Sequence, residues 1–419
     1  TRGSKLKGKK REFSEYIRLA RALELILSEI KLSSKEKVTF EEANGRVLAE
    51  DVEARANVPP FDRAAMDGFA VQAEDTFGAG ESDPKELEVV GSVEIGDSSE
   101  MRIESGEAAE ISTGAPMPSN ADSVVKVEDT YSGEESRIMV ISPVSPGKNV
   151  SSKGEDVKLG EKLFEAGHRV DPSDVGILAS SQNLDVEVRR RPEVGILATG
   201  SELRKPGTEL EPGEITEINT YTLDSAIRNS GGSPERLGIV PDDADRIEEA
   251  LGLSSKYDLL LVTGGTSVGK KDIIPDVIAE RGNLIFHGIA MRPGGPVGFG
   301  MVDGTPVFSL PGFPAATLIA FEMAVKPALL EMQGTSLESY HLEVRAELDR
   351  KINSNLGRLD IIRTKLSRED ERYVAEPIRL TGSSILTTIS RADGLIVVPE
   401  NKEGFKRGDE VPVKILEGL

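Results

Sequence analysis

Cysteine and tryptophan are absent from this 419-residue chain, and histidine occurs only three times. The lack of cysteine excludes disulfide bonds, thiolate metal sites and cysteine nucleophiles. A histidine-rich metal site is not expected either, so a bound metal would take oxygen ligands, as magnesium does. No apolar run reaches the ~18 residues of a membrane span, and no signal-peptide pattern opens the sequence. We therefore expect a cytoplasmic protein with no membrane partner.

Positive charge is also scarce, because the formal charge is −21 at pH 7. A nucleic-acid partner demands a basic face, so this balance argues against one. The exception is the first eleven residues, TRGSKLKGKKR, which carry six Lys or Arg and no acid. We interpret them as a solvated terminus. The composition, 38% hydrophobic and 29% charged, is that of a soluble globular protein, and the length predicts roughly two to four domains.

The first half of the chain mixes helical and strand-like patterns. Helical periodicity predicts a helix over 14–32 with Ser14 as its cap. The segment TFEEANGRVLAEDV predicts a second helix over 39–52 that begins at Thr39. Short alternating runs between about 86 and 145 predict a β-rich insertion. Helix and turn patterns return over 154–180, so the insertion interrupts an N-terminal domain.

After Arg191-Pro192 the pattern changes to apolar strands that alternate with helices. The strands are VGILATG, RLGIVPD and DLLLVTGG, and the helices lie over 220–231 and 244–253. Buried parallel strands have this continuous apolar character, which predicts a doubly wound, three-layer α/β domain. After Gly334 short strands and turns predict a small β-barrel.

The predicted fold class is thus α/β plus β, in several domains. They are an N-terminal mixed helix/strand linker domain (1–57 and 149–190), a β-rich inserted domain (58–148), the α/β domain (191–334) and a C-terminal small β-barrel (335–419).

Three glycine-rich turns follow predicted strands, at 263–272, 291–300 and 309–314. Backbone amides left bare by glycine hold oxyanions closely, so these turns predict a pocket for phosphate-like groups. The alternative is tight turns that need glycine for geometry alone. GGTSVGKK nearly matches the P-loop of nucleotidases, but Lys271 stands where Ser or Thr would coordinate magnesium.

Acidic side chains are expected beside these turns. Glu202, Asp242 and Asp272 follow successive strands, so they should meet at one edge of the sheet. Carboxylates would repel an anion bound by the neighbouring glycines unless Mg²⁺ or a sugar hydroxyl lies between them. The combination therefore predicts a nucleotide-like ligand with Mg²⁺. For Asp272 a helix-capping role is the alternative, and for Asp258 we favour a structural role. Arg292 in MRPGGP is a rigidly held cation for a small tetrahedral oxyanion, or part of a structural Pro-Gly turn.

Together these segments resemble the molybdopterin molybdenumtransferase family, the MoeA proteins and the gephyrin E domain. The resemblance runs from about Leu19 to the C-terminus, through VPPFDRAAMDGFAV, ISTGAPMPSNADSVVKVED, GEDVKLGE, ILATGSEL, VTGGTSVGKKD, MRPGGPVGFG, SLPGFPAA and RADGLIVVPE. It implies an elongated homodimer of four-domain subunits with a MogA-like α/β domain. It also implies the insertion of molybdate into adenylylated molybdopterin with release of AMP, assisted by Mg²⁺. The upstream molybdopterin adenylyltransferase is an implied partner.

The resemblance also implies roles for individual residues. Asp67 and Thr113 would act from the inserted domain of the neighbouring subunit, and Glu202, Asp242 and Asp272 would serve catalysis and the metal. The residues implied to bind the substrate are Gly264, Gly265, Ser267 and Gly269 in the glycine loop, and Arg292, Pro311 and Pro314 on the molybdate side.

The chain departs from the family pattern in three places. NVSSKGED has Ser151 where many relatives carry Arg, RPGGP has Gly295 in place of a second cation, and LPGFP has Phe313 in place of Asn. The oxyanion site therefore has fewer cations, and both molybdate and tungstate stay open as substrates. Two other functions also stay open: a non-catalytic dimeric scaffold of the same fold, and a P-loop-like nucleotidase.

Overall fold

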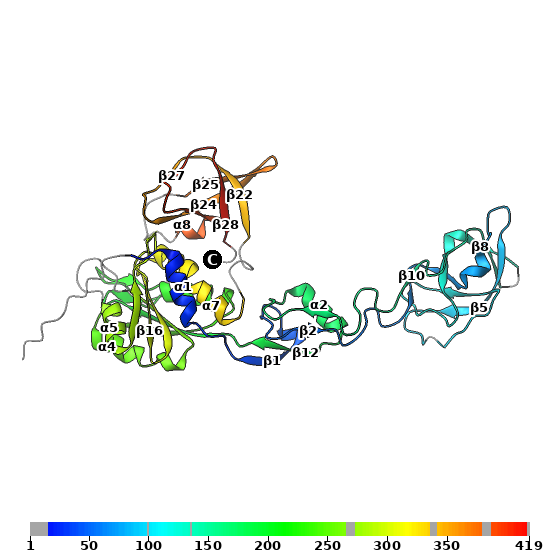
Figure 1. The fold of residues 1–419 in the computed structure, drawn as a ribbon, viewed down its shortest axis with the longest axis horizontal. Helices are drawn as coiled ribbons and strands as arrows, with labels where there is room; N and C mark the ends of the chain where they lie inside the picture. The colour runs from blue at the N-terminus through cyan, green and yellow to red at the C-terminus, as the bar shows by residue number, and fades with distance from the viewer. Residues whose placement is uncertain are drawn as a thin grey trace, which may run out of the picture. The chain divides into compact units, whose positions relative to one another are not determined.

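The computed structural model describes residues 16–98, 100–134, 136–264, 273–335, 342–378 and 387–416. The chain divides into two compact units (Figure 1). The larger unit comprises residues 1–36 and 189–419, and the smaller unit comprises residues 37–188. The basic N-terminal segment and Ser14 lie outside the described residues.

A six-stranded sheet forms the centre of the larger unit, in the order β16-β13-β17-β21-β20-β18. β13, β16, β17 and β21 are parallel, and β20 pairs antiparallel with β18 and β21. β17 is buried along its whole length, as its unbroken apolar sequence predicts. The bounds are β13 Glu193–Thr199, β16 Ser233–Val240, β17 Leu259–Thr263, β18 Asn283–His287, β20 Gly298–Val302 and β21 Thr305–Leu310.

Helices cover both faces of this sheet, which confirms the three-layer prediction. Ile196 and Leu261 belong to one core with α3 (Asn219–Asn229) and α6 (Pro314–Ala320). Leu197 and Leu260 belong to a second core with α4 (Ala244–Leu251) and α5 (Ile273–Arg281), which lie beside each other (Figure 1). Alternate residues of each strand thus enter opposite layers.

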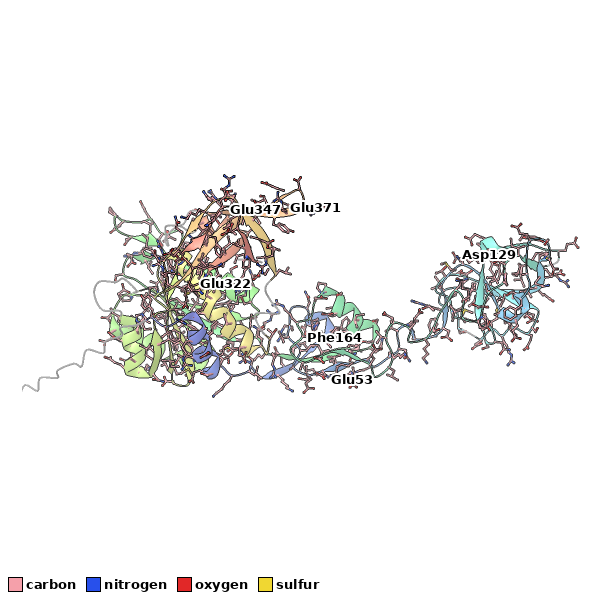
Figure 2. The ribbon with its side chains drawn as sticks, turned by 45° about the horizontal axis from the view of Figure 1, so that its top comes forward. Glu53, Asp129, Phe164, Glu322, Glu347 and Glu371 are labelled. Carbon is pink, nitrogen blue, oxygen red and sulfur yellow. The ribbon has the colours of Figure 1, made fainter. Side chains whose placement is uncertain are left out.

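The chain continues from α6 through a π-helical turn, Phe321–Val325, into α7 (Lys326–Met332). α1 (Leu19–Glu29) packs against α7 and buries Leu19, Ala22 and Ile26. In the π-helical turn Glu322, labelled in Figure 2, is 4% exposed. It pairs with Lys326, the first residue of α7, at 2.9 Å. The predicted first helix is therefore present, but it spans Leu19–Glu29 instead of 14–32, and its N-cap residue is Arg18, so the predicted Ser14 cap is wrong. The helix packs within the larger unit.

Five strands close a barrel near the C-terminus, because β24 pairs with both β25 and β26 while β22 and β28 complete the ring. The two-residue strand β19 (Met291–Arg292) joins the barrel beside the start of β24. Short elements accompany the ring: β23 Ile352–Asn353, α8 Thr387–Ser390 and β27 Gly404–Phe405. The ring strands are β22 Glu343–Leu348, β24 Leu359–Glu369, β25 Arg372–Pro377, β26 Gly394–Val398 and β28 Glu410–Ile415.

The smaller unit contains a second six-stranded sheet, in the order β7-β4-β6-β5-β9-β8, which confirms a β-rich region. Its strands are β4 Gly68–Val71, β5 Lys85–Val93, β6 Glu107–Ile111, β7 Ser123–Lys126, β8 Thr130–Ser132 and β9 Arg137–Val140. The remainder of the unit has two-stranded pairings and one capped helix, α2. These elements are β1 Lys35–Thr39, β2 Val52–Glu53, β3 Arg63–Ala64, β10 Val150–Ser151, β11 Lys162–Phe164, α2 Pro172–Ser180 and β12 Asp185–Arg189.

The predicted helix over 39–52 is wrong. A single 3-10 turn covers Phe40–Glu42, and Gly45 then takes a left-handed φ of +74°. Val47 and Leu48 form isolated β-bridges with Arg169 and Val188. The glycine stops the helix, and pairing with distant chain segments overrides the local helical pattern.

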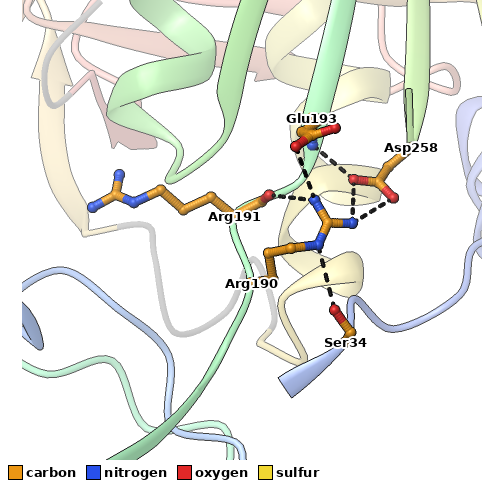
Figure 3. A network of polar contacts seen from close by, with 5 residues as sticks. All are labelled: Ser34, Arg190, Arg191, Glu193 and Asp258. Atoms are coloured by element: carbon orange, nitrogen blue, oxygen red, sulfur yellow. Dashed lines mark hydrogen bonds and ion pairs between the residues drawn. The ribbon is translucent and has the colours of Figure 1, made fainter. Parts of the chain in front are cut away.

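A polar network anchors the return of the chain into the larger unit (Figure 3). Arg190 makes two 2.8 Å hydrogen bonds to the carboxylate of Asp258. The same carboxylate accepts the Glu193 backbone N–H at 2.7 Å, and the Arg190 backbone N–H donates to Ser34 O at 2.8 Å. Asp258 therefore has the structural role that we expected for it.

Candidate functional site

A cavity of about 1240 Å³ opens at the carboxyl ends of the α/β strands in the larger unit. Its walls come from the ends of β13, β17 and β21, the turn at 291–296 and barrel strand β24. Open parallel sheets bind ligands at this edge, because loops and helix starts there leave unpaired polar groups. The volume is large enough for a nucleotide-sized molecule.

The acidic side of the cavity comes from two neighbouring strands. Thr199 at the end of β13 pairs with Val240 at the end of β16, so the loops that follow leave the same edge. Glu202 and Asp242 stand in these loops, and both line the cavity with exposed carboxylates. Two of the three predicted carboxylates are therefore brought to one cavity.

The third predicted carboxylate, Asp272, lies outside the described residues, as do Gly265, Ser267 and Gly269. Among the residues that the structure describes, no group of three His, Cys, Asp or Glu side chains is arranged to hold a metal ion. A metal site built from Glu202, Asp242 and Asp272 consequently stays a prediction.

Gly264, the first residue of the glycine loop, lines the cavity with a φ of +130°. A Cβ added there would lie 2.1 Å from the backbone oxygen of Thr199. Only glycine lets β17 end this close to β13, so here glycine serves close backbone approach.

A network of neutral side chains forms part of the wall. The amide nitrogen of Asn219, at the start of α3, donates to Thr263 Oγ1 at 3.1 Å and to Gly312 O at 2.8 Å. Thr263 Oγ1 in turn donates to Pro311 O at 3.0 Å. Asn219 Oδ1 and Thr199 Oγ1 are buried and have no hydrogen-bond partner among the residues that the structure describes. The sequence analysis missed this network, since an asparagine at a helix start is usually a cap.

The proline turn after β21 is held by the same network. Pro311 and Pro314 line the cavity, and Thr317 Oγ1 donates to Pro311 O and to Phe313 O. Phe313 also lines the cavity and is 59% exposed. The turn therefore presents a rigid wall with an apolar tip.

The basic side of the cavity combines the turn at Arg292 with barrel strand β24. Arg292 is exposed, whereas Arg363 is 4% exposed. Burial lowers the pKa of the Arg363 guanidinium, which still stays charged at neutral pH. Arg358 lines the same wall with its Nε 3.2 Å from Asp360 Oδ1. The sequence analysis missed both barrel arginines, because nothing in the strand pattern of the barrel placed them beside the α/β domain.

Two predicted residues lie in the smaller unit. The Asp67 carboxylate accepts the Thr113 backbone N–H at 2.6 Å and its hydroxyl at 2.8 Å. These bonds, the backbone one foremost, lower the pKa of Asp67. Asp67 is an exposed, firmly ionised carboxylate with one fixed partner, which suits binding a cation or a donor group.

Among the described residues no helix is long and apolar enough to cross a membrane.

Comparison with known families gives three matches along the chain. The region described as "MoeA N-terminal region (domain I and II)" matches residues 17–181. A "Probable molybdopterin binding domain" matches residues 195–331, and "MoeA C-terminal region (domain IV)" matches residues 345–416. Apart from Tyr16, the residues that line the cavity belong to the second and third of these regions.

Similar proteins cover nearly the whole chain. A putative molybdopterin biosynthesis protein of Methanocaldococcus jannaschii is 35% identical and covers 94% of this chain and 100% of its own length. The molybdopterin molybdenumtransferase of Bacillus subtilis is 33% identical, covering 92% and 91%. The crystal structure of a molybdopterin biosynthesis MoeA protein of Pyrococcus horikoshii matches with a TM-score of 0.84 at 35% identity, covering 96% and 100%.

Proposed function

Because this chain belongs to the MoeA family, we propose that it is a molybdopterin molybdenumtransferase that inserts molybdate or tungstate into adenylylated molybdopterin and releases AMP. The observation that supports this most is the division of one cavity into an acidic side and a basic side. Glu202 and Asp242 stand on the first, and Arg292 and Arg363 on the second, where Arg358 is paired with Asp360. The reaction brings a phosphate-linked pterin together with an oxyanion, so its site needs both an acidic side and a basic side.

The acidic side fits Mg²⁺, since exposed carboxylates are the oxygen donors that this ion prefers. We propose that Glu202, Asp242 and Asp272 hold it. The ion, when bound, would neutralise charge on the phosphate that links AMP to the substrate. The protein's own contribution at this side is to hold its carboxylates at one sheet edge.

The basic side would hold the oxyanion. Arg292 and the barrel arginines supply positive charge, and the turn at Pro311 and Pro314 supplies a wall that does not rearrange on binding. The dithiolene sulfurs belong to the substrate, so no side chain of the protein has to act as a nucleophile. Catalysis then rests on positioning and on charge stabilisation.

We further propose that the protein is a homodimer in which Asp67 and Thr113 of one subunit complete the cavity of the other. This arrangement would give the firmly ionised Asp67 a role. The four domain boundaries, the cytoplasmic location and the adenylyltransferase partner given above stay part of this proposal.

The experiment measures AMP release by the purified protein and by single variants. Asp67→Ala and Asp272→Ala should each abolish release while the thermal unfolding midpoint stays unchanged. Asp245→Ala, an exposed carboxylate in α4 that does not line the cavity, is the matched control and should release AMP normally. Full activity in both site variants would contradict the assignment. Failure of the wild-type protein to bind adenylylated molybdopterin would favour the scaffold function.

A further inference from the structure

Tyr16 is an exposed aromatic residue on the wall of the cavity. It is 55% exposed, yet it lines the cavity together with Arg292 and Gly295. An aromatic ring that is exposed to solvent beside a ligand-sized cavity has a face on which a ligand can pack.

The backbone of the residue after Tyr16 is held in place by hydrogen bonds. The N–H of Ile17 donates to Gly288 O at 3.1 Å, and Ala290 N–H donates to Ile17 O at 2.8 Å. These bonds form a parallel bridge between Ile17 and Ile289. Ile17, two residues before α1, is thereby attached to the segment that leads into the turn at 291–296.

Gly288 makes room for the ring, and Gly295 lies beside it. A Cβ added at Gly288 would lie 2.2 Å from Tyr16 Cδ1, and one added at Gly295 would lie 3.4 Å from Tyr16 Cε2. The ring therefore rests directly on bare backbone.

We propose that Tyr16 is a stacking platform for a planar heteroaromatic ring of the substrate, adenine or pterin. A ring supported by backbone on one side loses little freedom when a heterocycle stacks on it, and the cavity beside it offers charges for the attached phosphates. The inference rests on the proposed function for the identity of these two rings, but its tests measure binding and do not require turnover.

The absence of tryptophan from the chain permits a direct test. Tyr16→Trp places the only tryptophan of the chain at the proposed platform, where it can be excited apart from the remaining tyrosines, and AMP or 6-hydroxymethylpterin should quench its fluorescence saturably. Tyr373→Trp is the control, because this position is 43% exposed and does not line the cavity. Any loss of its fluorescence measures the light that each probe absorbs. Quenching by AMP alone assigns adenine, and quenching by the pterin alone assigns the pterin. No quenching beyond the control with either probe, or equal quenching by ribose 5-phosphate, would overturn the proposal.

Affinity separates stacking from a merely structural role. Tyr16→Ala should weaken binding of the quenching probe about tenfold, whereas Tyr16→Phe should keep wild-type affinity. Binding of ribose 5-phosphate should be unchanged in both. Equal losses for the probe and for ribose 5-phosphate in Tyr16→Ala would mean that the ring only supports the wall. If AMP or the pterin quenches the Tyr16→Trp variant as expected, but the wild-type protein shows no oxyanion-dependent AMP release, the proposed function is contradicted and the platform still stands.

Discussion

Replacing Asn219 by Asp tests whether the neutral network in the cavity wall is arranged as described. The two side chains have almost the same shape, so the change replaces only the donor nitrogen. In the native protein this nitrogen faces two oxygens, Thr263 Oγ1 at 3.1 Å and Gly312 O at 2.8 Å. A carboxylate oxygen in its place would face the carbonyl oxygen of Gly312 with no donor between them. Asn219 is 8% exposed, so water cannot relieve the repulsion fully.

The expected loss of stability depends on pH. Burial and repulsion should raise the pKa of the new carboxyl by about 2 from its unfolded value of ~3.9, to ~6. An acid with a raised folded-state pKa binds more protons when folded, so stability falls as pH rises between these two values and is constant above the second. The ionisation penalty is then about 1.5 kcal/mol at pH 5 and about 2.7 kcal/mol at pH 7. Each lost hydrogen bond adds about 1 kcal/mol.

Chemical denaturation followed by circular dichroism, at pH 5 and at pH 7, measures this difference. Asn283→Asp is the matched control, because Asn283 is exposed at the start of β18; it should change stability by less than about 0.5 kcal/mol. Asn219→Asp should be clearly less stable than the control, and the gap should widen from pH 5 to pH 7. A gap that is absent or independent of pH would show that the amide nitrogen does not face Gly312 O.

Three further predictions concern single contacts. Gly264→Ala should destabilise the protein by about 2–3 kcal/mol in a denaturant titration, because its Cβ would lie 2.1 Å from Thr199 O; unchanged stability would refute the close approach. Asp258→Asn should cost about 1–2 kcal/mol by urea unfolding, discounted because the side chain is 31% exposed; no loss would mean that the network in Figure 3 contributes nothing. Thr113→Val should raise the pKa of Asp67 in a carboxyl NMR titration, because one of its two lowering bonds is removed. The stabilisation from this lowered pKa is present above ~3.8 and is lost as pH falls through the folded-state value; an unchanged pKa would assign the whole shift to the backbone bond.

The α/β part of the fold could be predicted because its signal is local. Strands such as 194–199 and 259–263 are continuous apolar runs. Such runs are typical of a sheet that is covered on both faces, because both sides of each strand are then buried. The segment over 39–52 failed because its helical periodicity competes with Gly45 and with bridges to residues more than a hundred positions away. Local patterns carry no information about such partners.

The candidate site also contains residues that could be predicted from local sequence patterns and residues that could not. Glu202 and Asp242 could be placed together, since parallel strands end at a common edge. Tyr16 and Arg363 could not, because they reach the cavity from α1's leading segment and from the barrel, and only the packed structure shows that these segments meet the α/β domain. The role of Asn219 could be recognised only from its hydrogen bonds in the structure, because these distinguish a residue of the cavity wall from an ordinary helix cap.

The most direct test of the central claim is AMP release from adenylylated molybdopterin with Mg²⁺, measured with molybdate, with tungstate and with neither. The proposed function predicts release that depends on an oxyanion, and the anion that supports faster release is the natural substrate. Absence of release with either anion, in a protein that is folded and binds the adenylylated pterin, would contradict the transferase function.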